Sequence, residues 1–164
     1  MRVDSDEDRF PCPCCGHQVY SEGPGSYDIC PLCFWEDDPV QLRWPNWTGG
    51  ANHPSLIDAQ ANVATHGASE PRFVSNIRSP HKNEPLDPQW RPFDPDRDDI
   101  EAHIRGLDYG PLWPEDWTAF YYWRSDETRA RMLRSLQAKV RATVAEGQLT
   151  EGHPYWLAQP GIAL

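Results

Sequence analysis

The chain has 164 residues, of which 38% are hydrophobic, with a mean hydropathy of −0.74 and a formal net charge of −10. This length fits one ordinary domain, or a small metal-stabilised domain followed by a helical one. A membrane span is excluded because no segment approaches the roughly 18 consecutive apolar residues that one requires. The acidic first residues also lack the apolar core of a signal peptide. We therefore expect a cytoplasmic protein.

The negative charge is concentrated in the first half of the chain. Residues 1–70 contain three Arg and eleven Asp or Glu, whereas residues 71–164 contain twelve Lys or Arg and fourteen Asp or Glu. Phosphate backbones are bound by clustered Lys and Arg, because neutralisation of the phosphates supplies the affinity. Nucleic acid is therefore an unfavourable partner for the N-terminal half. Its first residues, 1–9, are typical of a disordered acidic tail.

Five cysteines lie close together after this tail, and four of them form two Cys-Pro-x-Cys steps separated by 14 residues. This C-x2-C…C-x2-C spacing is typical of a tetrahedral thiolate site with sulfur–metal distances of about 2.3 Å. An odd number of cysteines in so short a segment argues against a secreted disulfide framework. We predict that one structural Zn²⁺ is bound by Cys12, Cys15, Cys30 and Cys33.

Two alternatives to zinc remain at the same cysteines. Iron also accepts four thiolates at this spacing, although zinc is favoured. A redox-active dithiol usually precedes a helix in a βαβ unit, and no such unit is predicted here. The fifth cysteine, Cys14, could replace Cys15 as a ligand, be a spare thiol, or serve as a nucleophile with His17 or His53 as base. We interpret Cys14 and both histidines as structural, because four cysteines already complete a site.

The residues between the cysteine pairs predict a β-hairpin. Residues 17–20 and 26–29 flank a loop of Glu22-Gly-Pro-Gly25, and each strand leads into a cysteine pair. Gly16 is expected to supply a positive φ after the first pair. This is the layout of a zinc ribbon, which is too small to fold without its metal.

Two helices are predicted, one in each half of the chain. The first begins after an N-cap at Ser55, ends at Gly67 and carries an apolar face of Leu56, Ala59, Val63 and Ala64. The second spans residues 126–146, with Ser125 as N-cap, Gly147 as its stop, and Leu133, Leu136, Val140 and Val144 at helical spacing. A shorter helix is expected over 98–107, followed by the aromatic segment 112–123.

The fold class predicted from these elements is α+β. It comprises a zinc-ribbon-like β-hairpin domain with a helix at 10–70, a connector at 71–97 and an α-helical C-terminal part at 98–164. The connector is predicted because six prolines lie between residues 71 and 95, almost without apolar periodicity.

Two groups of motifs resemble the bacterial cysteine-rich CPCC domain family. They are Phe10-Pro-Cys-Pro-Cys-Cys-Gly16, and Cys33-Phe-Trp-Glu-Asp-Asp38 with the later Gly49-Gly-Ala-Asn52 loop. The resemblance covers about residues 10–70. It implies a small domain presumed to bind metal, and it supplies no activity that can be transferred to this chain.

The charge pattern leads to a functional hypothesis. Glu36, Asp37 and Asp38 are interpreted as a solvated acidic surface that attracts a basic partner. We therefore expect a non-enzymatic protein-binding module, for which an immunity protein that neutralises a basic toxin is the most concrete form. Two alternatives stay open: a zinc ribbon associated with nucleic acid or transcription, which would bind through the Arg-rich last helix, and a metal- or thiol-dependent enzyme that uses Cys14.

Overall fold

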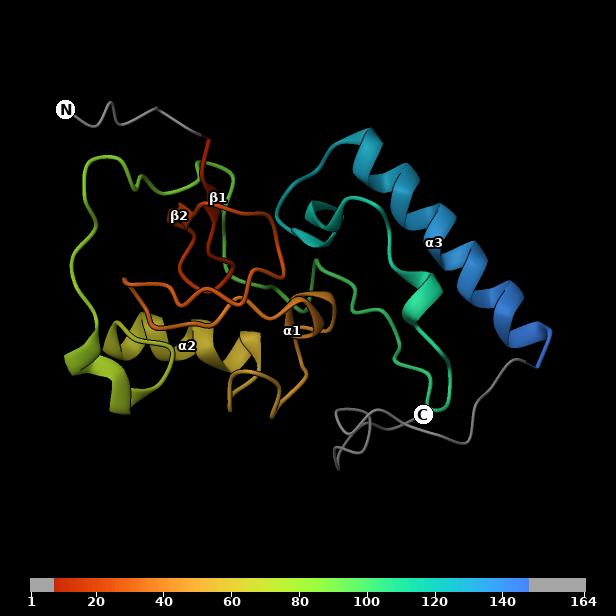
Figure 1. Cartoon of the computed structure of the whole chain (residues 1–164), viewed down its shortest axis with the longest axis horizontal. Coiled ribbons are helices and arrows are strands. Elements are labelled where there is room, and N and C mark those ends of the chain that lie inside the picture. The colour runs from red at the N-terminus through yellow and green to blue at the C-terminus, as the bar shows by residue number, and fades with distance from the viewer. Residues whose placement is uncertain (1–7, 148–164) are drawn as a thin grey trace.

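The computed structural model describes residues 8–147 (Figure 1). In chain order its elements are β1 Phe10–Pro11, β2 Gln18–Tyr20, α1 Pro39–Arg43, α2 Leu56–His66, η1 Pro71–Asn76, η2 Gly110–Leu112, η3 Trp117–Phe120 and α3 Glu127–Ala145, where η denotes a 3-10 helix. The predicted α+β class is confirmed. Over this part of the chain, no helix combines the length and the apolarity needed to cross a bilayer.

The β-hairpin is built differently from the prediction. β1 and β2 pair antiparallel, with Phe10 opposite Tyr20, so the hairpin encloses the first cysteine pair. Residues 26–29, predicted as the partner strand, form no strand; Ile29 makes a single antiparallel bridge with Glu36 around the second pair. The reason is that each Cys-Pro-x-Cys turn reverses the chain by itself, so the paired segments lie on either side of one turn.

The helix predicted after Ser55 is confirmed. The Ser55 hydroxyl accepts a hydrogen bond from the backbone N–H of Asp58 at 3.1 Å, which caps the first turn. Gly67 ends α2 with a φ of +84°, a left-handed conformation that glycine adopts without strain. Leu56 is buried on the inner face of α2, whereas Ala64, which was placed on the same face, is exposed.

The Pro-rich segment 71–97 returns to the β1–β2 hairpin (Figure 1). The backbone N–H of Gln18 donates to the carbonyl of Pro85 at 2.9 Å. The indole N–H of Trp90 donates to the carbonyl of Pro13 at 3.0 Å. Residues 84–90 of this segment therefore lie against the first cysteine turn, and the division of the chain into the predicted domains stays a prediction.

The helix predicted over 98–107 is absent, and the segment has an irregular backbone. Two of its carboxylates instead form ion pairs with arginines outside the segment. Asp98 is bound by both terminal nitrogens of Arg91, and Glu101 is bound at 2.7 Å by two nitrogens of Arg43. These ion pairs with Arg91 and Arg43 compete with local helix formation, and the spacing of apolar residues in the sequence does not indicate them.

The final helix, α3, matches the predicted span to within one residue at each end. Its N-cap is Asp126, not Ser125, and the Asp126 carboxylate accepts from the backbone N–H of Arg129 at 2.7 Å. Leu136 and Val140 form the buried part of the helix. Gly147 follows α3 with a φ of +70°.

Arg43, at the end of α1, joins the cysteine-rich part to the C-terminal part. Its side chain is fully buried, and in addition to Glu101 it donates to the carbonyl of Leu112 at 2.8 Å. Its guanidinium carbon lies 4.6–5.2 Å from the ring centres of Trp44, Tyr109, Trp113 and Phe120. One continuous hydrophobic core therefore extends from the cysteine pairs through Trp44 to Leu136 on α3.

Candidate metal centre

The four predicted ligands converge at one point. All four sulfurs of Cys12, Cys15, Cys30 and Cys33 lie within 4.8 Å of one another. The Cys12–Cys33 sulfurs are 3.6 Å apart and the Cys15–Cys30 sulfurs 3.7 Å apart. Four sulfurs placed tetrahedrally about 2.3 Å from one ion would be separated by about 3.8 Å. The cluster is therefore positioned to hold a metal ion, and its sulfurs are too far apart for disulfides.

The two cysteine turns have the same backbone hydrogen bonds. In the first turn, Cys12 donates to the carbonyl of His17 at 2.9 Å and accepts from Gly16 at 2.7 Å. In the second turn, Cys30 forms the same two bonds, donating to the fifth residue along the chain and accepting from Phe34. The repeated Cys-Pro-x-Cys step thus folds twice into one local structure, which directs two sulfurs from each turn toward the same point.

The position after each turn is left-handed. Gly16 has a φ of +81°, as predicted, whereas the equivalent residue in the second turn is Phe34, with a φ of +66°. A bulky residue is strained in this region of the backbone map. Phe34 packs its ring against that of Phe73, with the ring centres 4.3 Å apart. That contact with η1 offsets part of the strain.

Hydrogen-bond donors surround the sulfurs. The backbone N–H of Leu32 lies 3.4 Å from the Cys30 sulfur, and the hydroxyl of Tyr20 lies 3.6 Å from the Cys12 sulfur. Such donors stabilise thiolates over thiols. Cys12, Cys30 and Cys33 are fully buried and Cys15 is partly exposed.

The ionisation of the cluster requires a compensating cation. Burial raises the pKa of the Cys12 and Cys33 thiols well above the usual value. The pKa of Cys30 is lowered, chiefly by hydrogen bonding from Cys12 and then from Cys15 and Cys33. Four thiolates so close together in a buried site repel one another, so a bound cation would be needed to ionise all four.

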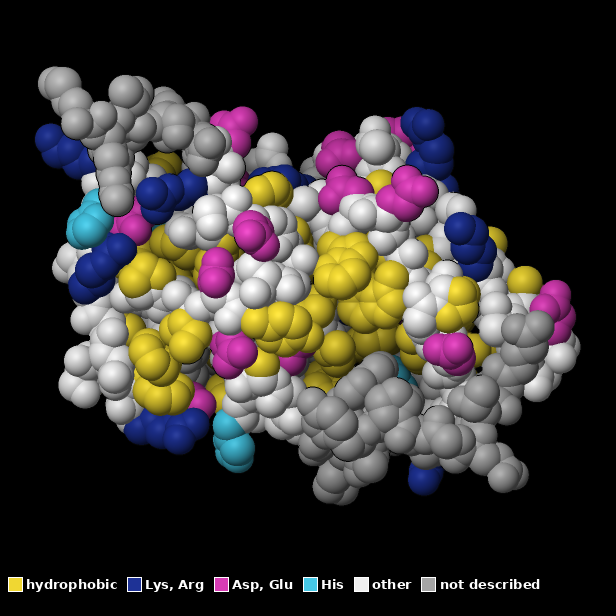
Figure 2. All heavy atoms as spheres, viewed as in Figure 1, with side chains coloured by type: hydrophobic (Ala, Val, Ile, Leu, Met, Phe, Trp, Pro, Cys, Tyr) yellow, Lys and Arg dark blue, Asp and Glu magenta, His cyan; other side chains and the backbone are white. Residues whose placement is uncertain are grey.

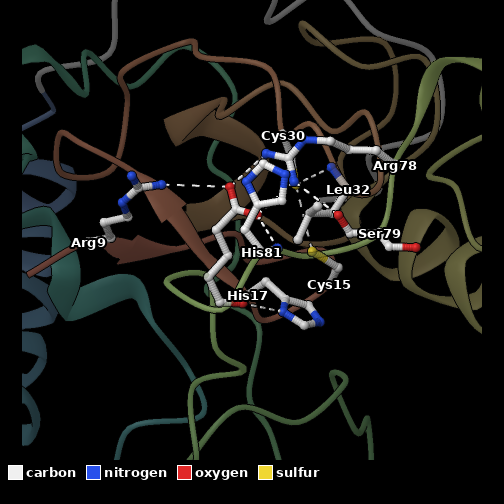
Figure 3. Close-up of polar contacts among 9 residues, drawn as sticks. Arg9, Cys15, His17, Cys30, Leu32, Arg78, Ser79 and His81 are labelled. Atoms are coloured by element: carbon white, nitrogen blue, oxygen red, sulfur yellow. Dashed lines mark hydrogen bonds and ion pairs between the residues drawn. The ribbon is translucent and has the colours of Figure 1, made fainter. Parts of the chain in front are cut away.

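A salt-bridge cluster lies beside Cys15 and Cys30 (Figure 3). Arg78 donates from both terminal nitrogens to the Glu84 carboxylate at 2.7 Å, and Arg9 lies 3.7 Å from the same carboxylate. The backbone N–H of Arg78 donates to Pro31, inside the second cysteine turn, at 3.1 Å. Arg78 lowers the pKa of Glu84 to about 2 through these hydrogen bonds. Through these contacts the segment after η1, which includes Arg78 and Glu84, packs beside the second cysteine turn.

The other candidate site residues lie outside the group of four. His17 bonds through Nδ1 to the carbonyl of Glu84 at 2.8 Å, and His53 is exposed. Cys14 is fully buried and points into the hydrophobic core. A spare exposed thiol was one expectation for Cys14, and it is wrong. A nucleophile must reach its substrate, and the buried Cys14 thiol has no access to solvent.

The interpretation of residues 36–38 as a solvated acidic surface is wrong for two of the three. Asp37 and Asp38 are 2% and 4% exposed. One oxygen of Asp37 accepts from the N–H groups of Gly25 and Ser26 and from the Ser26 hydroxyl, at 2.9–3.1 Å. Asp38 caps α1 by accepting from the N–H of Val40 at 2.7 Å. These acids are structural because they satisfy loop and helix N–H groups that would otherwise be unpaired.

Gln60, on α2, is a structural residue that the sequence did not indicate. Its side-chain nitrogen donates to the Pro13 carbonyl at 2.9 Å and to the Tyr122 hydroxyl at 2.8 Å. Its side-chain oxygen accepts from the N–H of Phe93 at 2.8 Å. A polar residue within a helix of mixed character gives no local signal of such contacts.

Comparison with known families identifies the cysteine-rich part. A model of the family described as cysteine-rich CPCC matches residues 10–84, which extends past residue 70 to Glu84 in the salt-bridge cluster. A comparison with curated protein sequences finds no match. Residues 10–84, which hold two equivalent cysteine turns and one convergent set of four sulfurs, therefore match the cysteine-rich CPCC family that the motifs suggested.

Proposed function

We propose that the chain is a non-enzymatic protein-binding module in which Cys12, Cys15, Cys30 and Cys33 hold Zn²⁺ as a structural ion. The observation that carries this proposal is that four protein sulfurs converge at tetrahedral spacing. A catalytic zinc site keeps one position for water or substrate, whereas four protein ligands leave none. Zinc imposes no geometry of its own from its d electrons, and a buried tetrathiolate is a common structural site for it.

The energetic role of the ion follows from the size of the domain. Within residues 8–84 the regular structure is one two-stranded hairpin and short helices, which is little for independent stability. Structural Zn²⁺ contributes about 10–16 kcal/mol at pH 7 in small zinc domains. That exceeds most of the 5–15 kcal/mol that stabilises ordinary domains. Removal of the ion is therefore expected to unfold the cysteine-rich part.

Elemental analysis of the purified chain tests this assignment. We expect one zinc per chain, no visible absorption from iron–thiolate bonds, and loss of structure on chelation. Cys30→Ser should reduce the zinc content, while Cys14→Ser, in the neighbouring turn, should retain it. Stoichiometric iron would contradict the choice of metal. Loss of zinc from Cys14→Ser alone would contradict the choice of ligands.

A basic protein is the partner class that we propose for this module. The chain carries a net charge of −10, and one face of the molecule bears apolar and acidic side chains next to each other (Figure 2). Tyr27 and Ile29 are 52% and 49% exposed, and Asp28 between them is also exposed. Aromatic and aliphatic anchors beside a charge suit a protein interface. Neutralisation of a basic nuclease toxin is the most concrete form of this proposal.

Co-expression with the products of adjacent genes tests the partner. A complex with a basic protein should form, weaken as salt is raised, and weaken further in Asp28→Asn. Asp96→Asn removes another exposed charge elsewhere and serves as the control. A complex that is insensitive to salt, or no complex with any basic product, would count against the proposal.

A further inference from the structure

A cavity of about 420 Å³ lies apart from the metal centre, at the junction of the two halves of the chain. Its walls come from the end of α1, from residues 91–101, from residues 120–125 and from the N-terminal half of α3. This volume falls in the range of small-molecule sites, which often form where separate parts of a chain meet. The cavity is therefore large enough for a small ligand.

The charges that line the cavity are mainly positive, in a protein that is acidic overall. Five arginines line it, against three carboxylates. Two of these carboxylates, Asp98 and Glu101, are each bound by two nitrogens of a lining arginine, so both ion pairs are already neutral. The third, Asp99, is exposed. The lining arginines outside these two pairs are Arg97, Arg124 and Arg129.

Arg129 carries a partly buried charge without a hydrogen-bonded carboxylate. Its Nε–H is buried and has no hydrogen-bond partner within the described residues. The nearby Asp126 carboxylate accepts from the backbone N–H of Arg129, as the cap of α3. Burial lowers the pKa of Arg129. A buried cation without a full set of acceptors costs folding free energy, and such groups are concentrated at functional sites.

Arg124 faces the same cavity. One terminal nitrogen forms an ion pair with the Asp87 carboxylate at 3.4 Å, and the same carboxylate oxygen accepts from the indole N–H of Trp123 at 3.2 Å. Its guanidinium is stacked 4.9 Å over the ring of Tyr121, which fixes its orientation. The hydroxyl of Ser125 and the apolar side chains of Phe120 and Leu133 complete this side of the cavity.

We propose that this cavity binds a small organic anion, with its carboxylate or phosphate on Arg129 and Arg124 and its apolar body against Phe120 and Leu133. A planar guanidinium is well suited to bind either anion through two parallel hydrogen bonds. The Nε–H of Arg129 is enclosed by protein, so the anion would be bound by the terminal nitrogens of this guanidinium. This site is independent of the metal centre and of the partner proposed above.

Calorimetric titration of the full chain with phenyl phosphate tests this proposal, with benzoate and inorganic phosphate as further probes. Phenyl phosphate should bind, and phenol, which has the same ring without the charge, should not. Arg129→Gln should weaken binding about tenfold or more, because a charge-assisted hydrogen bond contributes at least that factor. Arg131→Gln removes the same charge from an exposed position on α3 and should leave binding unchanged.

The melting temperature separates binding from folding in the same variant. Arg129→Gln removes a partly buried charge that Asp126 and Asp98 offset electrostatically, so the ligand-free variant should be about as stable as the wild type. If this variant fails to fold, that stability argument is wrong, and Arg124→Gln becomes the test of binding with the same expected weakening. Absence of binding by phenyl phosphate and by benzoate, or equal affinity in the Arg129→Gln and Arg131→Gln variants, would overturn the proposal.

Discussion

The ion pair between Arg43 and Glu101 gives the sharpest prediction for stability. The Arg43 side chain is 0% exposed and the Glu101 side chain 18% exposed, and two hydrogen bonds of 2.7 Å join them. Removal of one partner of a buried pair costs about 3–5 kcal/mol, because the remaining charge is left uncompensated. Glu101→Gln leaves the buried positive charge of Arg43 unpaired, while the amide oxygen of the new glutamine can still accept one hydrogen bond. We expect a loss of about 3 kcal/mol, at the lower end of that range.

The double variant makes this prediction specific to the charge. Arg43→Met with Glu101→Gln removes the lone cation and retains a flexible apolar side chain among the surrounding rings. The double variant should therefore be more stable than Glu101→Gln alone. If the two substitutions acted independently, their losses of unfolding free energy would add, and the double variant would be the less stable.

Thermal unfolding followed by circular dichroism measures both variants. A loss of about 3 kcal/mol corresponds to a melting temperature roughly 6–12 °C lower for a chain of this size. The concentration of free zinc must be held constant, because a bound ion shifts the apparent stability. A Glu101→Gln variant that melts within about 2 °C of the wild type, or a double variant that is the least stable of the three, would contradict this prediction.

Three further predictions concern the cysteine-rich part. Gly16→Ala should lower the free energy of unfolding by about 2–3 kcal/mol, because Gly16 has a left-handed backbone and the new methyl group would overlap the ring of Trp90. Gly147→Ala, which is also left-handed but lies in open space, should lower it by only about 1 kcal/mol, as measured by chemical denaturation. Asp37→Ala should cost about 2–3 kcal/mol, since it leaves two N–H groups and a hydroxyl without their acceptor, whereas Asp28→Ala on the surface should stay within about 0.5 kcal/mol. Glu84→Gln should be less stable than the wild type at pH 7. Because the pKa of Glu84 is lowered to about 2 in the folded protein, the difference in stability should vanish as pH falls from about 4.5 to 2. A difference in stability that persists at pH 2 would contradict this prediction.

The parts of the structure that the sequence predicts are those determined by neighbouring residues. The spacing of Cys12 and Cys15 identifies a metal-binding turn without knowledge of the remainder. Ser55 and Gly67 delimit α2 because a helix end is a local hydrogen-bonding problem. For the same reason the apolar spacing on α3 gives its bounds to within one residue.

The parts that could not be predicted depend on partners far away in the chain. Arg43 and Glu101 are 58 residues apart, and no local pattern distinguishes this pair from two solvated charges. Asp37 was interpreted as a surface acid for the same reason, since its acceptor role depends on a loop 11 residues earlier. Charge counts describe how much charge a segment carries, but burial of that charge is decided by the tertiary fold.

Gln60 connects the cysteine cluster with the C-terminal part, and this connection predicts a measurable coupling between metal binding and the stability of the C-terminal part. One amide bonds to the carbonyl of Pro13 inside the first cysteine turn, to the backbone of Phe93 and to the hydroxyl of Tyr122. Binding free energies that are coupled act reciprocally. The affinity of the cysteine cluster for a metal ion should therefore fall whenever the C-terminal part is destabilised, even by a substitution distant from every sulfur. A chelator titration would then report how firmly the two halves of the chain hold together.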